Sequence, residues 1–155
     1  MQTKLAHLSW TSVSTGLPKE VSDPIRPKWF AGRHEARLAS PLGITQFGVN
    51  HVTLDPGAYS ALRHWHEAED EFVYVLSGEL VLIDENGEHP LTAGGYAAFP
   101  AGEANAHHLA NRSSAPASFL AVGTRHRGVE TIHYPDDDAL GIATVERGAD
   151  GRRIG

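Results

Sequence analysis

The sequence contains no cysteine, which excludes disulfide bonds and thiolate chemistry. It also lacks an excess of basic residues: the formal net charge is −6, which argues against a general nucleic-acid binder. No apolar run approaches the roughly 18 residues of a membrane-spanning helix, and the first residues, MQTKLAHLSW, lack the apolar core of a secretory signal. We therefore expect a cytoplasmic protein with no membrane and no nucleic-acid partner.

Patterns typical of long helices are scarce, whereas turn residues are plentiful. Sixteen glycines and nine prolines are spread along the chain, with short apolar or alternating segments between them. Short strands at regular spacing predict an all-β sandwich or barrel. With 155 residues, of which 41% are hydrophobic, the chain is expected to form one domain with a substantial core.

Three segments of the chain differ in pattern. Residues 1–42 show no clean period and predict an irregular arm that packs on the barrel or on a partner subunit. Residues 43–125 read as a series of short strands and predict the barrel itself. Residues 126–155 predict an irregular C-terminal tail. The expected anchors of the N-terminal arm are Trp10, Trp29 and Phe30.

The stretch His64 to Gly78, HWHEAEDEFVYVLSG, carries the clearest chemical signal. In a strand, residues i and i+2 face the same way, so His64 and His66 project together and can chelate a metal. A short turn could bring Glu71 back from the neighbouring strand as an oxygen ligand. Taken alone, each part also has an ordinary interpretation: the histidines could be surface or hydrogen-bonded residues, and the acids a solvated turn.

The combination of motifs is more specific. HWHEAEDEFVYVLSG resembles the first motif of the cupin superfamily: His-x-His, four residues, Glu, six residues, Gly. Residues 94–102, GGYAAFPAG, followed by His107 and Asn111, resemble the second: Gly, five residues, Pro-x-Gly, then His, three residues, Asn. One departure is the loop between Gly102 and His107, which is longer than usual.

This resemblance implies a jelly-roll β-barrel (a double-stranded β-helix) with a metal inside. Carried over by position, its ligands are His64, His66, Glu71 and His107. His108 stays open as an alternative to His107 because of the longer loop, although His107 keeps Leu109 in the core. The set suits one divalent transition metal, and ligand type does not choose among Mn, Fe, Ni, Co, Cu and Zn.

Two classes of function follow from the resemblance. The first is a metal-dependent enzyme that acts on a small polar or anionic molecule through isomerase, dioxygenase or decarboxylase chemistry, among which the fold does not choose. The second is a metal-containing module that binds or senses a small ligand without turnover. An ionisable residue close to the metal would favour the enzyme. His51, Tyr59 and Arg63 lie near the first motif, but their ordinary roles in packing or at the rim are favoured.

Strands that are apolar on both faces need cover on both sides. Phe72, Tyr74 and Leu76 alternate with Glu71 and two valines, so the barrel interior covers only one set. The N-terminal arm or a second subunit must cover the other. We therefore expect a homodimer.

Overall fold

The protein is described by a computed structural model that covers residues 4, 13–15, 31–138 and 140–154. The expected anchors Trp10, Trp29 and Phe30 lie outside these residues. The described backbone is almost entirely strand and turn, with a single short 3-10 turn at Ser40–Leu42. Within it, no helix has the length and apolar character needed to cross a membrane.

The described strands, in chain order, are β1 (Val13–Thr15), β2 (Arg33–Arg37), β3 (Phe47–Leu54), β4 (Trp65–His66), β5 (Glu71–Ser77), β6 (Glu79–Asp84), β7 (Gly87–Thr92), β8 (Tyr96–Phe99), β9 (His108–Ala110), β10 (Ala117–Thr124), β11 (Gly128–His133), β12 (Ile142–Arg147) and β13 (Arg153–Ile154).

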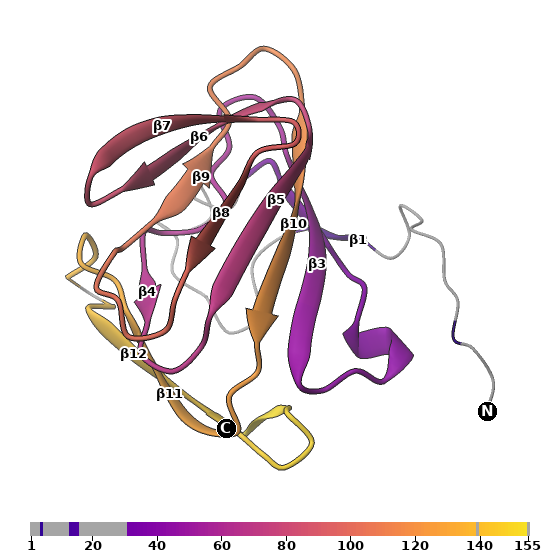
Figure 1. Ribbon diagram of the computed structural model, residues 1–155, viewed down its shortest axis with the longest axis vertical. Coiled ribbons are helices and arrows are strands. Elements are labelled where there is room, and N and C mark those ends of the chain that lie inside the picture. Colours follow the sequence, from indigo (N-terminus) through magenta and orange to yellow (C-terminus); the bar gives the residue numbers. More distant parts are fainter. Residues whose placement is uncertain (1–3, 5–12, 16–30, 139, 155) are drawn as a thin grey trace.

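These strands form three sheets (Figure 1). The largest has the order β1-β2-β3-β10-β5-β8, and a second has the order β7-β6-β9. Their inner faces share one hydrophobic core, to which β5 contributes Val75, β10 contributes Phe119, and β6 contributes Leu80 and Leu82. The third sheet, β13-β12-β11-β4, crosses the lower end of the molecule in Figure 1. The expectation of an all-β domain is therefore confirmed.

Strand β5 follows the alternation that its sequence predicts. Val73 and Val75 are buried in the core, whereas Phe72, Tyr74 and Leu76 are each more than a third exposed. Such alternation is typical of a sheet with one face against a core. Glu71, at the start of the strand, shares the inward side with the valines.

The two terminal segments differ from the expectation of irregular structure. Arg33–Arg37 forms β2, which pairs with β3 and widens the large sheet. In the C-terminal segment, residues 126–155, β11 pairs with both β12 and β4. The sequence of β11 does not show the burial pattern of a strand, because Glu130 is completely buried and Val129 is exposed, the reverse of the usual order. The boundaries at 42 and 125 stay predictions.

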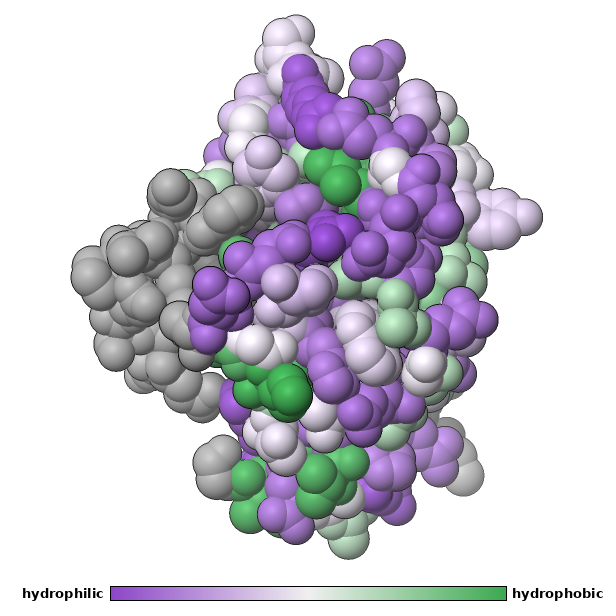
Figure 2. All heavy atoms as spheres, turned by 90° about the vertical axis from the view of Figure 1, so that its left-hand side faces the viewer, coloured by the Kyte–Doolittle hydropathy of each residue, from purple (hydrophilic) through white to green (hydrophobic). Residues whose placement is uncertain are grey.

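The outer surface differs from side to side. Figure 2 shows the side over β7, β4 and β12, which is mostly hydrophilic with a few separate hydrophobic groups. The outer face of β5 and β8 instead carries neighbouring exposed side chains, Phe72, Tyr74, Leu76 and Tyr96. The ring of Tyr96 stacks with those of Phe72 and Tyr74 at centroid distances of 6.0 and 6.5 Å. We call these four residues the aromatic face.

Candidate metal centre

Backbone pairing brings the two sequence motifs together at one end of the barrel. The N–H of His64 donates to the carbonyl of His107 at 3.2 Å, and the N–H of His107 donates to the carbonyl of His64 at 3.0 Å. In β4, His66 pairs with Ile132 of β11. Residues far apart in the chain are therefore fixed in one small region by ladder hydrogen bonds.

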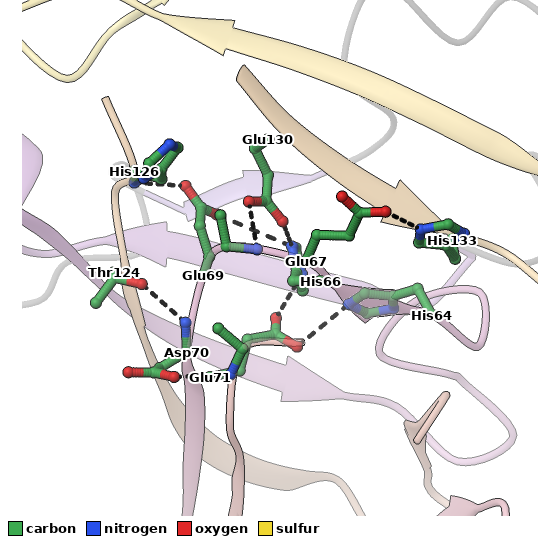
Figure 3. A network of polar contacts seen from close by, with 12 residues as sticks. His64, His66, Glu67, Glu69, Asp70, Glu71, Thr124, His126, Glu130 and His133 are labelled. Carbon is green, nitrogen blue, oxygen red and sulfur yellow. Dashed lines mark hydrogen bonds and ion pairs between the residues drawn. The ribbon is translucent and has the colours of Figure 1, made fainter. Parts of the chain in front are cut away.

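The four predicted ligands meet at the carboxylate of Glu71. The Nε2 atoms of His107 and His64 lie 2.7 and 3.4 Å from its Oε2, and Nε2 of His66 lies 3.3 Å from its Oε1. Figure 3 shows His64 and His66 pointing toward Glu71 from their own segments. Donor atoms of these three residues all lie within 4.8 Å of one another, and His107 joins them through its contact with Glu71.

Each of the three imidazoles binds an acceptor through its other nitrogen. In His64 and His107, Nδ1 donates to the backbone carbonyl two residues earlier, at 2.7 and 2.9 Å. In His66, Nδ1 donates to the carboxylate of Glu130 at 3.1 Å. Because Nδ1 holds the proton, the lone pair of each neutral ring is on Nε2, facing Glu71. Lone pairs facing a carboxylate require a cation between them, either a metal or protons.

The electrostatics of the cluster favour such a cation. Burial opposes the charge of Glu71, but hydrogen bonds from His107 and His64 hold the pKa of Glu71 well below its usual range. Burial also opposes a charge on His66, yet the hydrogen bond to Glu71, with the charges of Glu71 and Glu130, raises the pKa of His66 overall. The site therefore keeps a negative carboxylate that attracts positive charge to the surrounding nitrogens.

Glu130 is the member of the site that sequence reasoning missed. It is fully buried, and its Oε2 accepts the N–H of Ala68 at 2.9 Å while Oε1 binds His66 (Figure 3). Burial raises the pKa of Glu130, and the nearby His66 opposes part of that shift. A carboxylate on the far nitrogen of a ligating histidine fixes the ring and its tautomer. The only signal for it in the sequence was an acid inside GVETIH, a segment without a motif.

His108, the alternative to His107, occupies a different place. Its Nδ1 donates to the carbonyl of Ala61 at 2.9 Å, and its ring lies 5.1 Å from that of Tyr59. Burial lowers the pKa of His108, and the hydrogen bond to Ala61 opposes only part of this effect. Of the two residues, it is His107 that hydrogen-bonds to Glu71.

Two weaker sequence candidates, Arg63 and His51, lie outside the cluster. Arg63 makes ion pairs with Asp136, at 2.7 Å, and with Glu85, at 3.3 Å, which gives it a structural role at the surface. His51 lies in β3 between Asn50 and Val52, both of which line the cavity described next, so strand alternation turns His51 to the other side.

The cluster opens into a cavity of about 550 Å³, a size typical of small-molecule sites. Its walls are largely apolar, with Val52, Leu109, Phe119, Ile132 and Val145 among them. His108 and Tyr134 also line it, so ionisable side chains lie in the same space as the cluster. Such a cavity can hold a small polar molecule against the predicted metal ligands and exclude most water.

Comparison with known proteins agrees with this geometry. The Cupin domain family matches residues 50–123. The structure of a sugar phosphate isomerase from a cupin superfamily, from Silicibacter pomeroyi, is 42% identical in sequence over 97% of each chain, with a TM-score of 0.77. This chain belongs to the cupin superfamily. The cupin has the jelly-roll fold that its two motifs predicted.

Two further structures resemble this cupin. A candidate sugar phosphate isomerase from Acidithiobacillus ferrooxidans is 27% identical, covering 84% of this chain and 78% of its own, with a TM-score of 0.69. A predicted oxalate decarboxylase from Thermotoga maritima is 28% identical, covering 59% of this chain and 79% of its own, with a TM-score of 0.52. No curated protein matches the chain at a significant level of sequence similarity.

Proposed function

We propose that this cupin is a metal-dependent isomerase of small phosphorylated sugars. The observation that carries the proposal is the set of three imidazole Nε2 atoms around the Glu71 carboxylate, at the end of a cavity large enough for such a molecule. The class of substrate is suggested by the sugar phosphate isomerase that shares 42% of its sequence over nearly the whole chain.

The residues present fit a divalent transition metal. Three neutral imidazoles and one carboxylate, from His64, His66, His107 and Glu71, suit Mn, Fe, Co, Ni, Cu or Zn and leave positions open to substrate oxygens. When bound, the metal would act as a Lewis acid that polarises a carbonyl oxygen of the substrate. The protein fixes the ligand nitrogens in advance through the three Nδ1 hydrogen bonds.

Isomerisation also needs a group that moves a proton between neighbouring carbons. His108 lines the cavity, and because its Nδ1 donates to Ala61, its Nε2 holds the lone pair needed to accept a proton. Tyr134 lines the same cavity and lies 5.9 Å, ring to ring, from His64. These residues are our candidates for proton transfer, and they favour an enzyme over a module that only binds.

The test joins metal analysis to an isotope experiment. Protein purified without a histidine tag should carry close to one divalent metal per chain. With small aldose phosphates in deuterated water, NMR should show conversion to ketose phosphate with deuterium at the carbon that exchanges its proton. A chelator should abolish the conversion. One metal per chain without turnover of any phosphorylated sugar would replace the isomerase by a ligand-binding function, and absence of metal uptake would overturn both.

A further inference from the structure

A second, smaller cavity of about 160 Å³ lies beside the metal centre. Asn50, Glu71 and Ala121 line both cavities, so the two meet at the carboxylate on which the histidines converge. The smaller cavity also contains Arg125, which follows β10 directly. Neither the metal centre nor the proposed proton transfer uses this arginine.

Arg125 carries a charge without a partner in direct contact. Its side chain is partly buried, and the described part of the chain gives its guanidinium no hydrogen bond and no ion pair. Burial lowers the pKa of Arg125, and the positive charge of Arg147 lowers it further, while Glu69 opposes only part of this shift. A guanidinium that gives up hydration without gaining an acceptor is costly, which suits a group that receives an anion from outside.

The nearby acids are already engaged by other groups. Glu69 accepts Nε of Arg147 at 3.1 Å and a backbone N–H at 2.9 Å. Glu35 forms ion pairs with both Arg33 and Arg37. Asp70 and Glu71 also line this cavity, but Asp70 accepts the N–H of Ala101 at 2.8 Å and Glu71 faces the histidines. The acids therefore have donors of their own, and Arg125 is the one cationic side chain among the described lining residues that can receive an anion.

The backbone register places Arg125 close to the metal centre. In β10, Gly123 pairs with Glu71 of β5 on one side and with Gly48 of β3 on the other. Arg125 lies two residues further along, roughly 7 Å in an extended chain. Because the two cavities share Glu71, a short sugar can have its reacting carbons at the metal centre and its phosphate near Arg125.

We propose that Arg125 binds the phosphate group of the substrate, at a subsite separate from the metal. The proposal rests on the proposed function and names the recognition element for the phosphate end. The planar guanidinium can bind two phosphate oxygens at once, a geometry that arginine provides and lysine does not. Arg33 lines the large cavity, and its buried Nε has no hydrogen-bond partner among the described residues, but Glu35 already neutralises its charge.

Gly48 offers a second way to disturb the subsite. A Cβ atom at this position would lie 2.9 Å from Nη2 of Arg125, too close unless the guanidinium moves. The backbone of Gly48 is in ordinary strand conformation, so alanine is compatible with β3. Gly48→Ala therefore keeps the charge of Arg125 but displaces it.

The experiment is calorimetric titration of the full-length protein with inorganic phosphate. Arg125→Gln should weaken phosphate binding roughly 10- to 100-fold, the range for hydrogen bonds to a charged group. Gly48→Ala should weaken it by an intermediate factor. The matched control is Arg127→Gln, which removes the same charge from an exposed position two residues away and should leave the affinity within about twofold. Wild-type affinity in Arg125→Gln, or acetate binding as tightly as phosphate, would overturn the proposal.

Two comparisons separate this proposal from the proposed function. In His66→Ala, which should lose the metal, phosphate should still bind through Arg125. Phosphate binding that is lost in His66→Ala but kept in Arg125→Gln would place the anion on the metal and overturn the subsite. A protein without isomerase activity whose phosphate binding still depends on Arg125 would overturn only the proposed function. Thermal unfolding checks the fold of each variant. If Arg125→Gln does not fold, the phosphate affinity of Gly48→Ala tests the proposal in its place.

Discussion

Strands β5 and β11 differ in which kind of side chain they bury. In β5, Val73 and Val75 are buried and Phe72 is exposed, as expected for a strand against a hydrophobic core. In β11, Glu130 is fully buried, whereas Val129 is 55% exposed. A buried carboxylate is unfavourable unless it is paired. Glu130 is paired, because it accepts hydrogen bonds from Nδ1 of His66 and from the N–H of Ala68. The first strand builds the barrel, and the second gives up apolar burial to position His66, a predicted metal ligand on the neighbouring strand.

The largest effect is expected from loss of the histidine that β11 supports. We predict that His66→Ala lowers metal affinity more than about 100-fold, beyond the 10- to 100-fold range of outer-shell partners. Competition with a chromogenic chelator measures the affinity. His51→Ala is the matched control, because this histidine lies on β3 outside the cluster. Wild-type affinity in His66→Ala would show that the cluster does not bind the metal.

A paired substitution tests the register of the second motif. His107→Ala should lower metal affinity about as strongly as His66→Ala, since His107 Nε2 lies 2.7 Å from Glu71. His108→Ala should change it less than about tenfold, because its Nδ1 is directed to Ala61. Elemental analysis of both purified variants provides an independent readout. The reverse order of effects would make His108 the ligand.

Glu130 itself gives the next effect in size. Glu130→Gln keeps the shape of the side chain but weakens the hydrogen bond that fixes the His66 tautomer, so metal affinity should fall roughly 10- to 100-fold. Glu67→Gln is the matched control, because Glu67 binds His133 at the surface, at 2.7 Å. Equal affinities of Glu130→Gln and the wild type would mean that β11 has only a structural role.

The free energy of unfolding of the metal-free protein should be greatest within a narrow pH range. The raised pKa of His66 adds stability that is fully present below its unfolded value of 6.5 and is lost as the pH rises through the folded pKa. The lowered pKa of Glu71 adds stability that is present above 4.5 and is lost as the pH falls through its folded pKa. Stability should therefore peak between about pH 4.5 and 6.5. Denaturant unfolding of chelated protein from pH 3 to 9 measures it, and stability that rises steadily toward pH 9 would contradict the prediction.

The smallest effect on the site is expected from the outer surface of β5. We propose that two copies associate through the aromatic face, as its apolar character suggests. Tyr74→Lys should then shift the protein from dimer to monomer in light scattering at micromolar concentration, with metal affinity unchanged. Ile142→Lys changes an exposed apolar residue of β12 and should leave the dimer intact. A wild-type protein of monomer mass would argue against the association.

Sequence patterns predicted the barrel because its strands obey ordinary burial. Val73 and Val75 alternate with exposed neighbours, and the spacing of the two motifs predicted which residues would meet Glu71. The terminal strands could not be predicted in this way. In β2, Arg33 and Glu35 share a side, and in β11 the acid is inside, so neither segment shows a hydrophobic period. Charges turned inward serve a site rather than a core, and a single sequence gives no period for them.

The contact between His66 and Glu130 can form only late in the synthesis of the chain. The two residues are 64 positions apart, so the histidine leaves the ribosome well before the residue that orients it. At about 5 to 20 residues per second, the delay is roughly 3 to 13 s. During this interval His66 has neither β11 beside it nor the tautomer that Glu130 fixes. Under the proposed function, tight metal binding therefore begins only after β11 has been made and has paired with β4.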